Sequence, residues 1–311
     1  MRSTTLLVLL SVASAQTGGA VARTLFDDLG APGVLLLRLG IAAVVLALVA
    51  RPSLRSWTGV AWRAAVLLGT FAAGLNLLSY LALSIAPQGI VVTASFAGPL
   101  VLALAQTRRP ADLLWALVAG AGVVLLGLRA GVDVPLPGLL LALAAGACGA
   151  GYIVFSARLG GAVPGLGGLA VSFAVAALLV LPFGVAGAAG VARHPRLLAG
   201  VVAVALLSSV MPYALELVAL RSLSTRVFGV LMSLQPAAAA IAGFVILNQH
   251  LGPTPIAALI LVSAAGIGIT RPPRRIDPPD HKVVAQRCIR APDAPLGYHS
   301  GSRRAPHKPK W

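Results

Sequence analysis

The chain has 311 residues, of which 58% are hydrophobic and 10% are charged, and its mean hydropathy is +0.93. A water-soluble domain carries about a quarter of its residues as charges, so this composition excludes a soluble globular protein. The net charge of +16 does not indicate nucleic-acid binding, because ten of the 24 cations follow Thr270 and most others flank apolar runs. That distribution is typical of a membrane protein with several spans.

Ten apolar runs approach the ~20 residues that a membrane-spanning helix needs. The sequence therefore predicts an all-α membrane protein with ten transmembrane helices. The first run, with Arg2 ahead of it and A-S-A before Gln16, also resembles a cleavable signal peptide. We expect a retained helix, because cleavage would leave an odd number of spans. The runs are 4–22, 33–50, 64–84, 89–106, 111–128, 138–156, 167–187, 198–219, 227–247 and 254–270.

The distribution of Arg predicts the orientation of the chain. With the N-terminus inside, the cytoplasmic segments before the tail carry nine Arg and the outside loops carry four. Because cytoplasmic loops are enriched in basic residues, both termini are expected in the cytoplasm, at a bacterial inner membrane. The segment 271–311 has eight prolines, ten cations and three acids, which predicts a disordered basic tail. This tail either lies against anionic lipid or has no function.

An ungapped offset of 137 residues indicates an internal repeat. At this offset residues 81–83 (L-A-L) fall on 218–220 (V-A-L), and Pro99 falls on Pro236. Five helices per half mean that the second half enters the membrane from the opposite side. Such inverted repeats are the architecture of many secondary transporters. The expected repeats are residues 1–130 and 137–270.

Pro99 and Pro236 each interrupt an apolar run at matching places in the two halves. A proline inside a helix removes one i→i−4 hydrogen bond, and in hydrocarbon the freed carbonyl group must find another partner. Paired interruptions of this kind indicate a transport site near the midplane, between the repeats. We therefore expect Ser95 and Gln235, which lie beside the two prolines, to contact a substrate.

Apart from Asp112 at one end of a run, two charged residues lie inside apolar runs. Glu216, the only glutamate of the chain, is expected to bind a substrate ammonium group or to carry a proton. The alternatives are an ion pair with Arg38, Arg221 or Arg226, or access to the cytoplasmic interface. Arg38 lies about one and a half turns into the second run. It is expected either to hold a substrate carboxylate or to snorkel to the outer headgroups.

Further polar side chains inside the runs complete the candidate site. Together they can line a polar cavity, although each one alone equally forms a hydrogen bond between helices. Pro212, next to Tyr213, is a candidate hinge beside Glu216. The remaining candidate residues are Gln16, Asn76, Tyr80, Tyr152 and Tyr213.

The sequence predicts neither a metal site nor a cofactor. Cys148 and Cys288 are the only cysteines, and no Cys or His cluster has metal-ligand spacing. No G-x-x-x-x-G-K-[ST] motif occurs, so we expect no ATP hydrolysis. No nucleophile–base constellation appears either, and the chain is not expected to be an enzyme.

Eight segments within residues 4–270 resemble EamA-type members of the drug/metabolite transporter superfamily. Each motif is weak alone, but the ordered set is specific, and it is most similar to the inner-membrane exporters of threonine and homoserine. The motifs are A-S-A-Q-T-G-G-A-V-A-R-T-L-F at 13–26, G-A-P-G-V-x-x-L-R-L at 30–39, N-L-L-S-Y at 76–80, F-A-G-P-L at 96–100, R-R-P-A-D at 108–112, G-A-C-G-A-G-Y-I at 146–153, L-L-S-S-V-M-P-Y-A-L-E at 206–216 and L-S-T-R-V-F-G-V-L-M-S-L-Q-P-A at 223–237.

The resemblance implies a ten-helix, two-repeat exporter of small amino acids that is driven by the proton gradient. Threonine and homoserine are the first candidate substrates. The chain departs from these exporters at three positions, since Ser95, Gln235 and Gln249 are neutral where those exporters have glutamate. Glu216 is retained and is therefore the acid left in the membrane for binding an amine or a proton. The substrate or the coupling of this chain can accordingly differ from theirs.

The sequence alone is also consistent with two functions other than amino-acid export. One is an exporter of another small metabolite or drug. The other is a non-transporting membrane sensor or scaffold that uses its basic tail to bind lipid. Deletion of 271–311 separates transport from scaffolding, because a transporter should keep its flux without the tail.

Overall fold

The computed structural model describes residues 2–105, 110–128, 135–163, 165–220 and 231–270, and the regular structure in these ranges is helical. The chain divides into two units, Met1–Arg271 and Pro272–Trp311, and the predicted tail lies outside the described residues. The described part of the first unit contains six helices that are long and apolar enough to cross a membrane. It also contains four shorter apolar helices.

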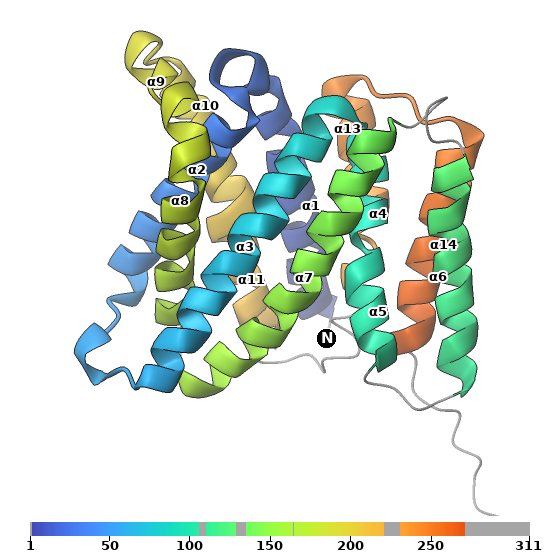
Figure 1. The fold of residues 1–311 in the computed structure, drawn as a ribbon, viewed down its shortest axis with the longest axis horizontal. Coiled ribbons are helices and arrows are strands. Elements are labelled where there is room, and N and C mark those ends of the chain that lie inside the picture. The colour runs from blue at the N-terminus through green and yellow to red at the C-terminus, as the bar shows by residue number, and fades with distance from the viewer. Residues whose placement is uncertain (1, 106–109, 129–134, 164, 221–230, 271–311) are drawn as a thin grey trace, which may run out of the picture. The chain divides into compact units, whose positions relative to one another are not determined.

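The helices follow the order of the predicted runs (Figure 1). The first half contains α1 (Arg2–Thr24), α2 (Phe26–Ala50), the 3-10 turn η1 (Leu54–Ser56), α3 (Gly59–Ile85), α4 (Gln88–Ser95), α5 (Ala97–Ala105) and α6 (Pro110–Leu128). The second half contains α7 (Leu136–Ala162), α8 (Gly167–Ala188), α9 (Gly190–Arg193), α10 (Leu197–Ala205), the π-helix η2 (Leu206–Val210), α11 (Met211–Leu220), α13 (Gln235–Leu247) and α14 (Pro253–Thr270).

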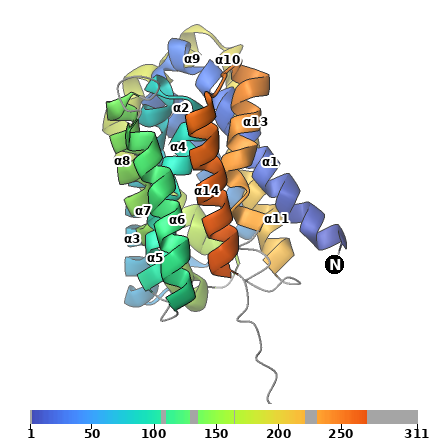
Figure 2. The same cartoon turned by 90° about the vertical axis from the view of Figure 1, so that its right-hand side faces the viewer.

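Helices of the first half pack against helices of the second half. Helix α2 lies along α8, α3 along α7, and α6 along α14. Helix α1 packs against α11 and α13, and α4 packs against α13. Figure 2 shows α6 beside α14, and α13 next to α14. The largest fully buried side chains, such as Phe173 of α8 and Leu35 of α2, lie where the two halves meet.

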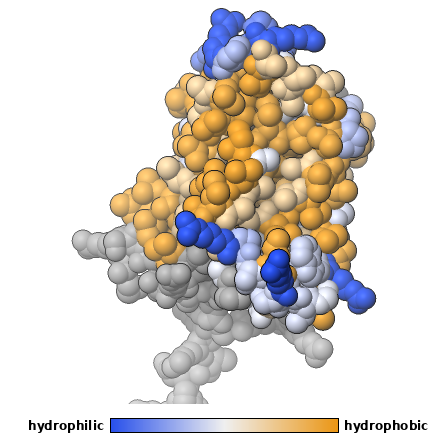
Figure 3. Space-filling model, turned by 90° about the vertical axis from the view of Figure 1, so that its left-hand side faces the viewer, coloured by the Kyte–Doolittle hydropathy of each residue, from blue (hydrophilic) through white to orange (hydrophobic). Residues whose placement is uncertain are grey.

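The sides of the bundle are apolar. Leu48, Leu178 and Phe183 are examples of large hydrophobic side chains that remain exposed. Figure 3 shows hydrophobic residues over the middle of one face and hydrophilic residues gathered at its two ends. Water-soluble monomers rarely expose continuous apolar surfaces of this extent. This face therefore suits contact with lipid chains.

Glycines allow α2 and α8 to approach closely. A Cβ atom added to Gly33 would lie 2.9 Å from the backbone nitrogen of Ala188. A Cβ on Gly187 would collide with the carbonyl oxygen of Leu29. Backbone therefore contacts backbone at this crossing, as in other membrane helix pairs that use small residues.

The substitution Gly33→Ala is expected to destabilise this helix pair by about 1–3 kcal/mol, because the added methyl group has no room. Gly40→Ala, on the same helix, is the matched control, since a Cβ there meets nothing within 4 Å. Thermal unfolding of the detergent-solubilised variants measures both effects. Equal Tm values for the two variants would show that α2 and α8 can move apart at this crossing without loss of stability.

The two proline-containing runs are interrupted in the structure. Helix α4 ends at Ser95 and α5 begins at Ala97, which places Pro99 in the first turn of α5. Helix α13 begins at Gln235, after a turn, with Pro236 at its start. Proline fits the first turn of a helix, where its missing N–H group would have no helical partner.

Helix α2 is divided at Gly30, whose backbone angles (φ 67°, ψ 153°) are not helical. The longer part, which follows Gly30, begins close to residue 33, where the predicted run begins. The part before Gly30 is a short helical turn that contains Asp27 and Asp28. These two acids lie where the positive end of a helix dipole favours negative charge.

Candidate functional site

Arg38 lies in the middle of α2 and is only 7% exposed. Its Nε donates to Ser209 Oγ at 3.0 Å, its Nη1 to Tyr80 Oη at 2.8 Å, and its Nη2 to Asn76 Oδ1 at 2.8 Å. Asn76 is itself fixed by a bond from Nδ2 to the carbonyl oxygen of Ala72. Arg38 lies eight residues after the non-helical Gly30 (38 − 30), about 12 Å along the helix axis, and 12 residues before the end of α2 (50 − 38). The structure therefore does not support the alternative that Arg38 snorkels to the outer headgroups.

The partners of the Arg38 guanidinium are neutral. A guanidinium carries five N–H donors, and the three bonds leave two of them available. Among the described side chains, the ion pair within 4.0 Å is Arg23–Asp27, at the α1–α2 junction, so Arg38 and Glu216 are not paired. A buried cation without a counter-ion is costly. This arrangement therefore suits an anion with two acceptor oxygens.

Aromatic side chains surround this cation. The Tyr152 hydroxyl of α7 donates to the Tyr213 hydroxyl of α11 at 3.0 Å. Tyr213 packs edge-on against Phe173, with ring centroids 5.4 Å apart. Both tyrosines lie close enough to Arg38 and to Glu216 to interact electrostatically with them. The tyrosine pair therefore lies in the neighbourhood of both charged groups.

The π-helix η2 supplies a residue that the sequence did not indicate, Ser209. Pro212 has no N–H to donate to the carbonyl of Ser208, and the chain is π-helical from Leu206 to Val210, just before this proline. Ser209 Oγ accepts from Arg38, whereas Ser208 Oγ is buried without a hydrogen-bond partner. A Cβ on Gly18 would collide with Ser208 Oγ, so α1 lies directly against this segment.

Glu216 contacts α1. Its Oε1 accepts a hydrogen bond of 2.7 Å from Ser11 Oγ, and Ser11 is completely buried. Arg221 and Arg226, the other predicted ion-pair partners, lie outside the described residues. A serine in an apolar helix is a weak signal in sequence. The contact of Ser11 with Glu216 depends on the packing of α1 against α11, which the sequence does not show.

Ser209, Tyr213 and Glu216 follow one another at i, i+4 and i+7, which places them on one face of the η2–α11 segment. We call these three residues the polar stripe. Each contacts a different helix, because Ser209 bonds to α2, Tyr213 to α7 and Glu216 to α1. The stripe rises about 10 Å from Ser209 to Glu216. One helix face therefore carries the Ser209 partner of Arg38 at one end and Glu216 at the other.

A second polar cluster contains three glutamines. Gln88 is 1% exposed, and its Nε2 donates to the Gln16 carbonyl oxygen at 2.8 Å and to Gln16 Oε1 at 3.2 Å. Gln249 Oε1 accepts from the Gln88 backbone N–H at 2.9 Å and so caps the start of α4. The hydrogen bonds found for Gln16 in the described part of the chain thus involve Gln88 and not Arg38. Gln249, where the resembling exporters carry glutamate, serves here as a helix cap.

Ser95 and Gln235 do not join the Arg38 cluster by any hydrogen bond in the described part of the chain. Ser95 Oγ donates to the Val91 carbonyl oxygen of its own helix at 2.8 Å. Gln235 Nε2 donates to Met232 Sδ at 3.1 Å. Both bonds are local and satisfy the polar groups beside the helix interruptions.

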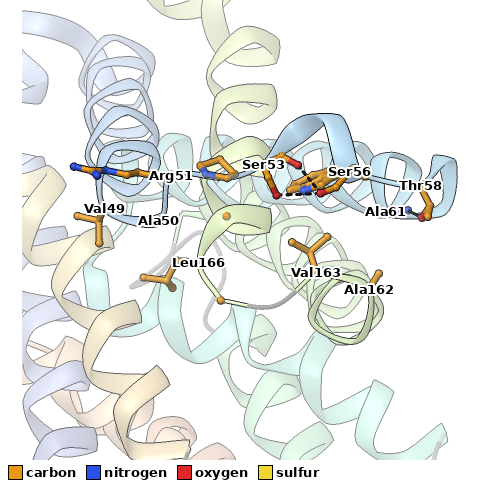
Figure 4. Close-up of a pocket in the computed structure, with 14 residues that line it drawn as sticks. Val49, Ala50, Arg51, Ser53, Ser56, Thr58, Ala61, Ala162, Val163 and Leu166 are labelled. Atoms are coloured by element: carbon orange, nitrogen blue, oxygen red, sulfur yellow. Dashed lines mark hydrogen bonds between the residues drawn. The ribbon is translucent and has the colours of Figure 1, made fainter.

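A pocket of about 470 Å³ lies between the α2–α3 and α7–α8 connections (Figure 4). It is lined by Trp57, Leu166 and two serines, Ser53 and Ser56, which are bonded to each other. The Arg51 side chain extends away from these serines in Figure 4. None of the predicted site residues lines this pocket, and it is separate from the Arg38 cluster.

Comparisons with known proteins place the chain in a family. Residues 136–271 match the model of the EamA-like transporter family. The threonine/homoserine exporter RhtA of Salmonella typhimurium is 39% identical over 273 residues, which cover 87% of this chain and 92% of that protein. RhtA of Escherichia coli K12 is 39% identical over 267 residues, which cover 85% of this chain and 90% of that protein.

One solved crystal structure is also similar, with a TM-score of 0.53 and 19% sequence identity. The match covers 93% of this chain and 99% of the other chain. At that identity the likeness shows the fold alone. The sequence relatives and the long apolar helices together show that this chain is a multi-pass bacterial membrane protein that belongs to the EamA-like transporter family.

Proposed function

We propose that the chain is a secondary transporter that exports small amino acids, with threonine and homoserine as the first candidates. The observation that carries this proposal is Arg38, a cation at mid-helix whose partners among the described residues are all neutral. The carboxylate of an amino acid supplies the missing charge and accepts from the two remaining N–H groups. The names of the RhtA relatives support the same substrate class.

The neighbours of Arg38 provide contacts for the rest of the substrate. The Tyr80 ring lies 5.3 Å from the guanidinium carbon, and Tyr213 and Phe173 add aromatic surface nearby. An ammonium group is attracted to aromatic faces, and the tyrosine hydroxyl groups can accept from it. The hydroxyl group of threonine or homoserine can bond to the same hydroxyl groups. Asn76 and Ser209 hold the cation in position for this contact.

We further propose ten spans in two inverted repeats, residues 1–130 and 137–270. In the proposed repeat, each helix of the first half corresponds to the helix in the same place of the second half, so that α1 corresponds to α7 and α3 to α11. The contact of α3 with α7 then corresponds to the contact of α11 with α1. The pairs α2–α8, α4–α13 and α6–α14 each consist of two corresponding helices. Such a pattern is what a two-fold axis in the membrane plane produces. The interruptions near Phe96 and Ser233 lie 137 residues apart and support the same pairing.

The contact between the two interrupted spans supports alternating access between the repeats. Helices α4 and α13 run antiparallel, since Gln88 lies beside Gly243 and Gly89 beside Ala240. The same register, continued along both helices, brings Ser95 to the start of α13 at Gln235. Pro99, Pro236 and Pro212 then mark the places where the spans bend.

Coupling to protons is assigned to Glu216, the carboxylate at the other end of the polar stripe. Tyr152 and Tyr213 interact electrostatically with both Arg38 and Glu216, which supports a coupling between the substrate site and this acid. Both termini are placed in the cytoplasm of the cell, at the inner membrane, in accord with the excess of Arg in the inner loops. The chain acts as a carrier in this account and not as an enzyme.

Inside-out membrane vesicles test the proposal. Vesicles that contain the protein should accumulate labelled threonine or homoserine when their lumen is made acidic, and a protonophore should prevent the accumulation. Vesicles without the protein should not accumulate either amino acid. Accumulation of neither, by a correctly inserted protein, would contradict export of small amino acids.

A further inference from the structure

We propose that Ser11 is a positioning residue that holds the Glu216 carboxyl group in both of its protonation states and so keeps α1 attached to α11 during transport. This inference rests on the proposed proton role of Glu216. It adds a residue on another helix, 205 positions away in the chain.

The geometry gives the Ser11 hydroxyl two acceptors. Ser11 Oγ lies 2.7 Å from Glu216 Oε1 and 3.4 Å from the carbonyl oxygen of Pro212. Ser11 is 0% exposed, so its proton has to go to a protein acceptor. Helix α1 packs along α11 over this region.

The two acceptors match the two states of the acid. While Glu216 is ionised, the Ser11 O–H group donates to the carboxylate, in a charge-assisted bond. A proton from solution then forms one O–H bond on the carboxylate and neutralises it. The new acid O–H group donates to Ser11 Oγ, and the Ser11 proton turns to the Pro212 carbonyl oxygen. No bond between heavy atoms changes, and the contact between the helices is kept.

Few titratable groups other than Glu216 lie in this region of the described chain. The titratable side chains that interact with Glu216 in the described part are Tyr213 on its own helix and Tyr152 on α7. Arg38 of α2 acts on both tyrosines. Residues 3–22 of α1 and residues 206–210 of η2 contain no titratable side chain. Ser11 is accordingly the hydrogen-bond donor that α1 presents to Glu216.

Ser14 provides a matched control one turn along α1. It is also a buried serine of this helix, but its Oγ donates to the Leu207 carbonyl oxygen at 2.8 Å and not to Glu216. Threonine at position 11 keeps the hydroxyl group, whereas alanine removes it. Three variants therefore distinguish loss of the bond to Glu216 from a general effect of removing a serine from α1. They are Ser11→Ala, Ser11→Thr and Ser14→Ala.

The experiment measures the protonation of Glu216 directly. Dicyclohexylcarbodiimide couples to protonated carboxyl groups in apolar surroundings, and mass spectrometry follows its addition to the Glu216 peptide of the purified full-length protein against pH. Glu216→Gln defines the background. Labelling of Ser11→Ala should extend to a higher pH by about one unit, because a bond that favours the charged form is lost. Ser11→Thr and Ser14→Ala should follow the wild type.

A Ser11→Ala curve that superimposes on the wild-type curve would overturn the inference, as would an equal shift in Ser14→Ala. The labelling does not depend on a substrate. If wild-type vesicles accumulate no amino acid, the proposed function fails, while the labelling curves still decide the role of Ser11.

Discussion

Replacement of Arg38 by lysine should lower the rate of threonine export by roughly 100-fold or more, because a lysine cannot make the planar, two-pronged contact with a carboxylate. Three neighbours hold the Arg38 guanidinium group in position. Ser209, Tyr80 and Asn76 each accept a hydrogen bond from a different nitrogen of this group. A lysine side chain ends in a single nitrogen, so it cannot replace the bonds of three separate nitrogens and also present two parallel N–H groups to a carboxylate. Initial rates in inside-out vesicles, at matched protein levels, measure the effect.

Arg23→Lys is the control for this experiment. Arg23 also lies over an aromatic ring, that of Phe26, and also donates to an oxygen atom, the carbonyl of Ser84. It lies in the last turn of α1 and is paired with Asp27. Its replacement by lysine should leave export nearly unchanged. Export by Arg38→Lys at the wild-type rate would remove Arg38 from substrate binding.

Replacement of Glu216 by glutamine should uncouple export from the proton gradient. The glutamine side chain keeps the shape of the glutamate and still accepts from Ser11, but it cannot bind a proton and cannot carry charge. Threonine movement down its own gradient should therefore continue, while accumulation driven by an acidic vesicle lumen should disappear. Counterflow and gradient-driven uptake, measured with the same vesicles, separate these two activities.

Asp28→Asn is the matched control for charge removal, since Asp28 is a carboxylate in the first turn of α2, away from the polar stripe. This variant should keep gradient-driven accumulation. Proton-driven accumulation that survives in Glu216→Gln would remove Glu216 from the coupling mechanism.

Local rules explain the parts of the fold that were predicted from sequence. Proline acts on its own helix, so an interruption near Pro99 and another near Pro236 follow from the residues alone. Hydropathy likewise located the long apolar helices. It missed only the short helical turn before Gly30, because Asp27 and Asp28 lower the local hydropathy although they suit the first turn of a helix.

Position in the sequence could not decide between snorkelling and substrate binding for Arg38, because this residue lies only eight positions after the break at Gly30 (38 − 30). The surroundings of its guanidinium group distinguish the two. Arg38 is buried and donates hydrogen bonds to Tyr80 and Asn76, which supports the proposal of substrate binding.

The partners of the charged groups could not be predicted. Ser209 is 171 residues from Arg38, and Ser11 is 205 residues from Glu216. Serine is common in apolar helices, and only the packing of α1 and α2 against η2 and α11 brings these pairs together. Conversely, Gln16 and Ser95 appeared equivalent to the true neighbours of Arg38 in sequence, but their hydrogen bonds are made elsewhere.

Arg38 is proposed to bind the carboxylate of an amino acid inside the membrane. Calorimetry of threonine and of threonine amide with the purified wild-type protein tests this role, because the amide keeps the ammonium and hydroxyl groups and lacks the carboxylate. Threonine should bind, whereas threonine amide should neither bind nor compete with threonine. Equal affinity for the two compounds would show that Arg38 does not recognise the carboxylate.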